Sequence, residues 1–122
     1  MTRQQLVPGP DHPITIESTD RRVTVTVSGR TIVDTTNAVI LQEAGYPAVY
    51  YVPLAEVDPD VLRPSDHETY CPFKGEASYY SVATDDGELA DVVWTYRKPY
   101  DAVAQIKDHV AFYANRVDIS VG

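Results

Sequence analysis

Apolar and polar residues alternate strictly near the start of the chain, where Val23, Val25 and Val27 are separated by two threonines. Alternation with a period of two is typical of a β-strand that buries one face. The alternation stops at a Ser-Gly pair, residues 28–29, and a second β-rich run follows it. The pattern therefore predicts a β-hairpin that turns at the glycine.

Other stretches of the chain have a similar β-type composition. The runs NAVILQE (37–43) and PAVYYVP (47–53) are short and apolar, and the Gly and Pro between them favour two strands over one helix. Residues 77–96 contain two β-rich runs around an Asp-Gly pair, which predicts a tight hairpin. The run VDIS (117–120) predicts a last strand.

Two segments depart from this pattern. Between residues 54 and 66, two prolines remove backbone donors and predict a loop, with one helical turn near Leu54 to Val57. Behind Pro99 the period changes, and a helix of about ten residues is expected from typical helix lengths. Its apolar positions are Ala102, Val103, Ile106 and Val110.

These patterns predict one domain over residues 1–122 that is mainly β with one C-terminal helix. A chain of 122 residues can bury a single core without disulfides. The first twelve residues are expected to be the most mobile, because chain ends are seldom held by packing.

Charge and composition exclude several classes of partner. The net charge is −8, and no basic cluster interrupts it, so we expect no nucleic-acid or membrane partner. The apolar runs are too short to span a bilayer, and the first residues lack the apolar core of a secretion signal. A single cysteine cannot form an internal disulfide. A cytoplasmic location is the expectation.

The segment SDHETYCPFKG (65–75) concentrates side chains that are capable of chemistry. If it is extended, His67, Thr69 and Cys71 point to one face. Cys71 is a candidate nucleophile activated by His67 or Lys74, or else a small core residue. His67 is a candidate base, or else a polar residue that stabilises a turn.

Lys74 and Gly75 form a second kind of candidate site. A cation beside a glycine that permits close backbone approach can seat a carboxylate or phosphate. The alternative is a solvated surface lysine. Arg22 and Arg30 likewise can bind an anionic ligand or pair with some of the eighteen acidic residues.

The aromatic residues suggest a binding function. Nine tyrosines accompany one tryptophan, and a splayed sheet can gather some of them into a box that holds a planar or cationic ligand. Strand alternation requires that about half of them pack in the core instead. The candidates are Tyr50, Tyr51, Tyr70, Tyr79, Tyr80, Trp94 and Tyr96.

Four motifs resemble, in order, those of a bacterial family of domains of unknown function, family 427, which carries a nucleotidyltransferase-like label. They are Thr69 with CPFKG (71–75), ASYYS (77–81), WTYRKPY (94–100) and AFYANRV (111–117). The resemblance covers roughly residues 12 to 118. It implies a β-tent, or Mss4-like, fold of splayed antiparallel sheets.

Two features associated with this resemblance are not matched by the residues. β-tent proteins hold zinc through two Cys-x-x-Cys pairs, and one cysteine cannot supply such a site, so we expect no metal or other cofactor. Nucleotidyltransferases carry a Gly-Ser before paired carboxylates. The tight acidic pair Asp58-Pro59-Asp60 has no Gly-Ser before it, and its proline favours a turn.

Two functional hypotheses follow for a small-molecule ligand that is anionic or planar. In the first, His67, Cys71 and Lys74 act as catalytic groups. In the second, a non-catalytic Tyr/Trp box recognises a ligand or peptide and Cys71 packs in the core. The residues expected to contact the ligand are Thr69, Gly75, Tyr79, Trp94, Tyr96, Tyr50 and Arg22.

Overall fold

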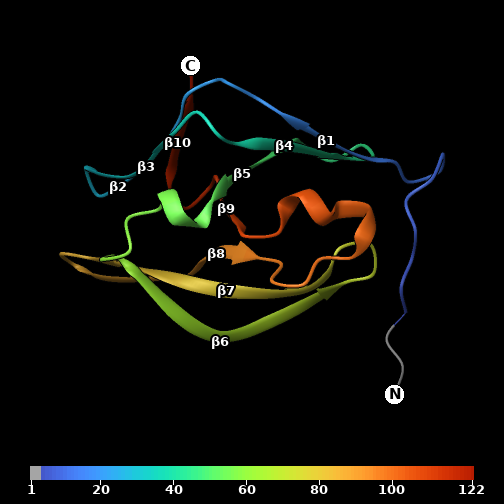
Figure 1. Ribbon diagram of the computed structural model, residues 1–122. Coiled ribbons are helices and arrows are strands. Elements are labelled where there is room, and N and C mark those ends of the chain that lie inside the picture. Colours follow the sequence, from blue (N-terminus) through green and yellow to red (C-terminus); the bar gives the residue numbers. More distant parts are fainter. Residues whose placement is uncertain (1–3) are drawn as a thin grey trace.

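The computed structural model describes residues 4–122, which form ten antiparallel strands and two short 3₁₀-helices (Figure 1). The strands are β1 (Ile14–Ser18), β2 (Val23–Val27), β3 (Arg30–Thr35), β4 (Val39–Glu43), β5 (Val49–Pro53), β6 (Leu62–Cys71), β7 (Gly75–Thr84), β8 (Gly87–Thr95), β9 (His109–Phe112) and β10 (Asp118–Val121). The helices are η1 (Leu54–Glu56) and η2 (Asp101–Ile106). The prediction of a mainly β, antiparallel fold is confirmed.

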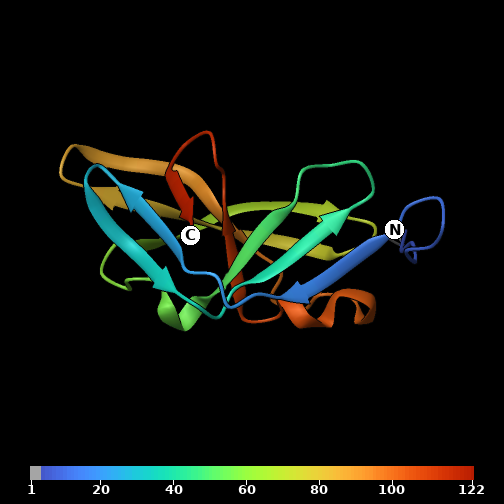
Figure 2. The same cartoon turned by 90° about the horizontal axis from the view of Figure 1, so that it is seen from above.

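The strands form a seven-stranded sheet in the order β1-β4-β5-β9-β8-β7-β6 and a three-stranded sheet in the order β10-β2-β3. In Figure 1 the large sheet folds over at β5 and β9, so that β1 and β4 lie above β7 and β6. The helix η2 lies at the open side of these two layers, next to β1 (Figures 1 and 2). Seen from above in Figure 2, the β2–β3 hairpin and the β1–β4 pair lie next to each other over the layer of β6 to β8.

The turns explain why the hairpins form where the sequence predicts them. Ser28 and Gly29 both have positive φ, 50° and 81°, as a two-residue turn that matches the twist of the flanking strands requires. The hairpins β4–β5 and β7–β8 are also formed, the latter around residues 85–86. The predicted helical turn at residues 54–57 is present as η1, and the last strand as β10.

The predicted C-terminal helix is wrong. Residues 101–106 form the short 3₁₀-helix η2, which is interrupted at Val103 by a non-helical conformation (φ −127°, ψ 29°). Asp108 then adopts a positive φ of 63° and the chain enters β9. Val103 and Ile106 are buried as expected, because a spacing of three residues also suits a 3₁₀ turn. Neither helix in residues 4–122 is long and apolar enough to cross a bilayer.

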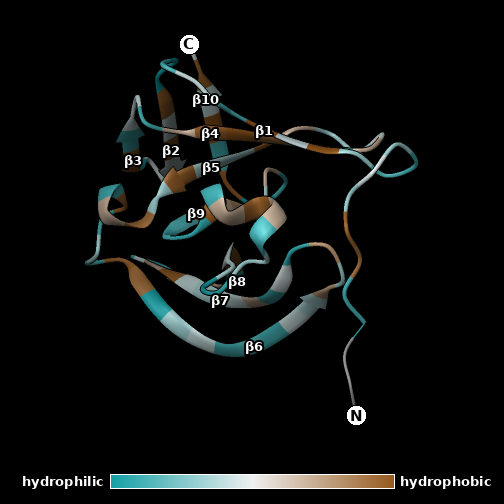
Figure 3. Cartoon of the chain, turned by 45° about the vertical axis from the view of Figure 1, so that its right-hand side comes forward, coloured by the Kyte–Doolittle hydropathy of each residue, from teal (hydrophilic) through white to brown (hydrophobic). Residues whose placement is uncertain are grey.

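The predicted loop over residues 54–66 is also shorter than expected, because β6 begins at Leu62. Pro64 is tolerated in this strand since β6 lies at the edge of the sheet, and the pairing with β7 is irregular just after it. Figure 3 shows β6 as largely hydrophilic, whereas β4 and β5 carry much of the hydrophobic colour.

Each face of the large sheet packs against its own core. One face meets the three-stranded sheet through a cluster rich in valine, including Val25, Val52 and Val93. The opposite face encloses a second cluster that contains Leu41, Tyr51, Tyr79, Tyr96, Val103, Ile106 and the small residues Ala77 and Ala111. The aromatic residues and the candidate site belong to this second cluster.

Candidate functional site

The second core opens into a cavity of about 170 Å³, here called the aromatic pocket. Five tyrosines and the single tryptophan line it together with one lysine, one glutamate and three aliphatic or proline side chains. The aromatic side chains are Tyr46, Tyr51, Tyr79, Trp94, Tyr96 and Tyr113. The predicted gathering of aromatic residues from several strands is therefore present.

Strand register places the rings on one face. Tyr79 in β7 lies opposite Trp94 in β8, and Trp94 lies opposite the small Ala111 in β9, which leaves room above it. The indole Nε1–H of Trp94 donates a hydrogen bond to the hydroxyl of Tyr51, 3.1 Å away. The ring of Trp94 lies 4.6 Å from that of Tyr113, centroid to centroid.

Tyr96 differs from its neighbours in the pocket. Its side chain is 6 % exposed and lines the cavity, yet its hydroxyl makes no hydrogen bond to any residue in the range 4–122. In contrast, the hydroxyl of Tyr79 is bonded to Thr69 at 2.9 Å. Burial raises the pKa of Tyr96 well above its ordinary value, so the hydroxyl keeps its proton at neutral pH and can donate as well as accept.

An ion pair closes one end of the pocket. Nζ of Lys74 lies 2.5 Å from Oε1 of Glu43, and the side chains are only 13 % and 14 % exposed. The other carboxylate oxygen, Oε2, is 2.7 Å from Nε2 of His12. Desolvation, the largest single influence, raises the pKa of Glu43, but hydrogen bonds from Lys74 and His12 outweigh it and hold this pKa below its ordinary value.

Gly75 does allow a backbone segment to approach closely, but that segment belongs to the same chain and not to a ligand. Its φ is +112°, and a Cβ at this position would lie 3.3 Å from the carbonyl oxygen of Lys98. The amide of Tyr100 donates to the carbonyl of Lys74 at 3.0 Å. Gly75 thus anchors the segment after β8 beside the pocket rather than lining it.

The three candidates in β6 lie on the face that the extended pattern predicts. The ring of His67 contacts that of Tyr79 at 4.5 Å, Thr69 bonds to the same tyrosine, and Cys71 packs against the second core. However, four residues of strand span about 13 Å, so His67 and Cys71 are too far apart along β6 for a direct hydrogen bond. No nucleophile–base pair is formed between them.

Tyr50 and Arg22 lie away from the pocket. Alternation along β5 turns Tyr50 toward the first core, whereas its neighbour Tyr51 faces the pocket. Tyr80 is likewise directed away from Tyr79 and packs against the first core. Arg22 forms an exposed pair with Asp34 at 2.5 Å, so the acid-pairing alternative holds for it.

Comparison with protein families identifies one family that covers most of the chain. The model of the family described as domain of unknown function (DUF427) matches residues 15–122. The chain belongs to the DUF427 family. Every lining residue of the aromatic pocket lies within the matched range, whereas His12 lies just before it. A search of curated proteins found no match.

The charged and aromatic contributors to the site that were not singled out from the sequence are Glu43, His12, Tyr46 and Tyr113. Glu43 ends an apolar strand, and its partner Lys74 lies 31 residues further along the chain, so no local sequence pattern predicts this pair. His12 reaches the same carboxylate and stacks on Phe73, with ring centroids 4.0 Å apart. Tyr113 follows directly after β9, which was expected to be helical.

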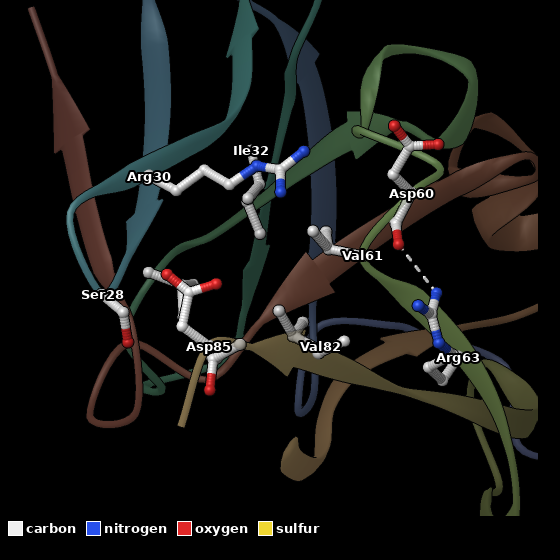
Figure 4. A pocket seen from close by; sticks show the side chains of 11 residues that line it. Ser28, Arg30, Ile32, Asp60, Val61, Arg63, Val82 and Asp85 are labelled. Carbon is white, nitrogen blue, oxygen red and sulfur yellow. Dashed lines mark hydrogen bonds between the residues drawn. The ribbon is translucent and has the colours of Figure 1, made fainter. Parts of the chain in front are cut away.

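A second hollow of about 200 Å³ lies at the opposite end of the domain, near the turns of the β2–β3 and β7–β8 hairpins (Figure 4). Arg30 reaches over it, but its guanidinium pairs with Asp58 at 2.5 Å. Arg63 donates to the carbonyl of Asp60 at 2.8 Å. The amide of Asp60 bonds to the carboxylate of Asp58, as expected for a turn. Both guanidinium groups of this hollow are thus engaged with their own chain.

Metal binding has no candidate within residues 4–122, since these contain no cluster of three or more His, Cys, Asp or Glu side chains that could hold an ion.

Proposed function

We propose that this DUF427 domain is a recognition module that binds a small planar molecule in the aromatic pocket without reacting with it. The observation that carries the proposal is the hydroxyl of Tyr96. It belongs to a buried residue, lines an open cavity, and has no hydrogen-bond partner in the described part of the chain. No buried side-chain polar atom in the described residues lacks a partner, so this hydroxyl is open to the cavity, where a ligand that enters can replace water as its hydrogen-bond partner.

The size and walls of the pocket support a flat ligand. A cavity of about 150 Å³ with apolar walls holds one benzene ring, and the aromatic pocket measures about 170 Å³. Trp94 and Tyr79 lie opposite each other on adjacent strands and present ring surface to the cavity. Flat aromatic walls with hydroxyl groups at the edge suit a single planar ring that carries a polar group.

The geometry gives less support to catalysis by His67, Cys71 and Lys74. Lys74 is paired with Glu43, and Cys71 makes no hydrogen bond to a base among residues 4–122. Nucleophilic catalysis normally needs such a contact.

The proposal includes two further predictions. One is a relationship to β-tent folds, which the two splayed layers suggest, and the other is a cytoplasmic location.

Trp94 provides a direct test because it is the only tryptophan and lines the pocket. Purified protein is titrated with a panel of small planar metabolites while tryptophan fluorescence is recorded. We expect at least one compound to change the emission saturably. Tyr96→Phe should weaken that response by about 2- to 10-fold, as expected for one lost hydrogen bond.

Tyr80→Phe is the matched control, because Tyr80 directly follows the pocket residue Tyr79 in β7 but packs against the first core. It should leave the response unchanged. A folded protein in which no planar compound alters Trp94 emission would contradict the proposal. Turnover of a bound compound that is abolished by Cys71→Ser would instead support the catalytic alternative.

A further inference from the structure

We infer that the ligand of the aromatic pocket is uncharged as well as planar. The inference rests on the proposed function and adds a chemical class to it. It follows from how the charges of the pocket are arranged, since a desolvated charge is costly unless it meets an opposite charge or a set of hydrogen bonds.

The charges that line the pocket already cancel. Lys74 and Glu43 are its only charged lining side chains within residues 4–122. They are in direct contact at 2.5 Å, and His12 occupies the second oxygen of Glu43. A ligand carrying a net charge would enter a site whose formal charge is zero when His12 is neutral, and it would have to compete with one member of the pair for the other.

Each sign of ligand charge meets a specific obstacle. For a cation, the aromatic faces would be the attractive element, but the ammonium of Lys74 already lies 5.8 Å from the ring centre of Tyr96. For an anion, Lys74 is the available partner, but Lys74 is paired with Glu43, whose carboxylate would repel an anionic ligand. The overall charge of −8 further disfavours the approach of anions.

An uncharged polar group meets neither obstacle and can form a hydrogen bond with the hydroxyl of Tyr96. The hydroxyl of Tyr96 is protonated and unpaired in the described chain, so it can donate to a carbonyl or ring nitrogen, or accept from an amide. The ring that carries this polar group would lie against Trp94 and Tyr79. The ligand class is therefore a single planar ring, homo- or heteroaromatic, with an uncharged hydrogen-bonding substituent.

The test uses one ring in three charge states: nicotinamide (neutral), nicotinate (anionic) and 1-methylnicotinamide (cationic). The indole N–H resonance of the sole tryptophan, Trp94, is followed by NMR, because this group donates to Tyr51 within the pocket. Benzamide and benzoate serve as a second matched pair. We expect the neutral member of each series to shift the resonance at a concentration lower by on the order of tenfold than its charged counterparts.

Two charge variants make the test specific. Glu43→Gln leaves Lys74 unopposed and should move the preference toward nicotinate, whereas Lys74→Met leaves Glu43 and should move it toward 1-methylnicotinamide. Glu43→Gln keeps the size of the side chain, so it decides the matter if Lys74→Met does not fold.

The outcomes separate the two claims. Tighter binding of a charged member by the unmodified protein, or variants that leave the preference unchanged, would overturn the inference and leave the proposed function standing. If no compound of any charge shifts the Trp94 resonance in the folded protein, the proposed function fails and the inference fails with it.

Discussion

The ammonium of Lys74 and the carboxylate of Glu43 lie 2.5 Å apart and join two layers of the domain. The two residues are 31 positions apart in the sequence. Glu43 ends β4 in the upper layer, and Lys74 lies in the turn between β6 and β7 in the lower one (Figure 1). Because both side chains are mostly buried, the pair fixes the polar end of the aromatic pocket and sets its charge.

This pair should give stability a pH dependence. The pKa of Glu43 is lowered in the folded state, so its contribution is fully present above the ordinary value of 4.5 and is lost as the pH falls below it. We expect the difference in free energy of unfolding between the unmodified protein and Glu43→Gln to be constant above about pH 5.5 and to shrink below pH 4.5.

Urea unfolding from pH 3 to pH 7 measures this difference. Glu17→Gln, which removes an exposed carboxylate from the neighbouring β1, is the control. A Glu43→Gln difference that grows as the pH falls would contradict the assigned ion pair.

Gly75 should be essential for stability rather than for binding. Its φ of +112° is a conformation that other residues seldom adopt, and an added Cβ would crowd the carbonyl of Lys98 at 3.3 Å. We expect Gly75→Ala to lower the free energy of unfolding by about 1 to 3 kcal/mol. Gly45→Ala has open space around it and no positive φ, so it should be nearly neutral in the same thermal or urea unfolding experiment.

Ile106 should be a major contributor to the second core although it lies in a 3₁₀-helix. It is fully buried and packs with Val103 and Leu41. We expect Ile106→Ala to destabilise the domain by about 2 to 5 kcal/mol, as measured by chemical unfolding. Ala102→Ser, at an exposed position of the same helix, should change stability by less than about 0.5 kcal/mol. Equal effects of the two changes would show that η2 is not docked as described.

Stability should not depend on a metal ion. The chain has one cysteine, and residues 4–122 hold no cluster of metal ligands. We expect EDTA to leave the melting temperature of the purified protein unchanged. A stoichiometric zinc in that protein, or a collapse of the melting temperature on chelation, would contradict this and would make His67 and Cys71 candidate ligands.

Cys71 should behave as a packed residue. It is half-buried against the second core and lies about four strand positions, or ~13 Å, from His67. We expect a thiol reagent to modify it slowly in the folded protein and rapidly after unfolding in urea. Fast modification in the folded state that accelerates as the pH rises through neutrality would favour the catalytic hypothesis instead.

Local sequence carries enough information for the hairpins but not for the pocket. The Ser28-Gly29 pair and the Asp86-Gly87 pair are short-range signals, and both hairpins form as predicted, the second with its turn at residues 85–86. Alternation also shows that Tyr50 and Tyr51 face opposite ways. It cannot show which of them faces the pocket, because that depends on how the large sheet folds over, and Tyr51 is the residue that does.

The errors have a common physical origin in long-range pairing. The spacing of Val103, Ile106 and Val110 suits a helix, but the third residue is buried in a four-residue strand between β5 and β8. A central strand buried on both faces shows no alternation to reveal it. Glu43 was missed for a related reason, because its partner Lys74 is distant in sequence.

The proposed function is tested most directly by a crystal structure of the protein with the planar compound that changes Trp94 emission most strongly. We predict that the compound lies in the aromatic pocket, against Trp94, with a polar atom within hydrogen-bond distance of the Tyr96 hydroxyl. A compound bound instead in the hollow beside Arg30 and Arg63, with Tyr96 still unpaired, would contradict it.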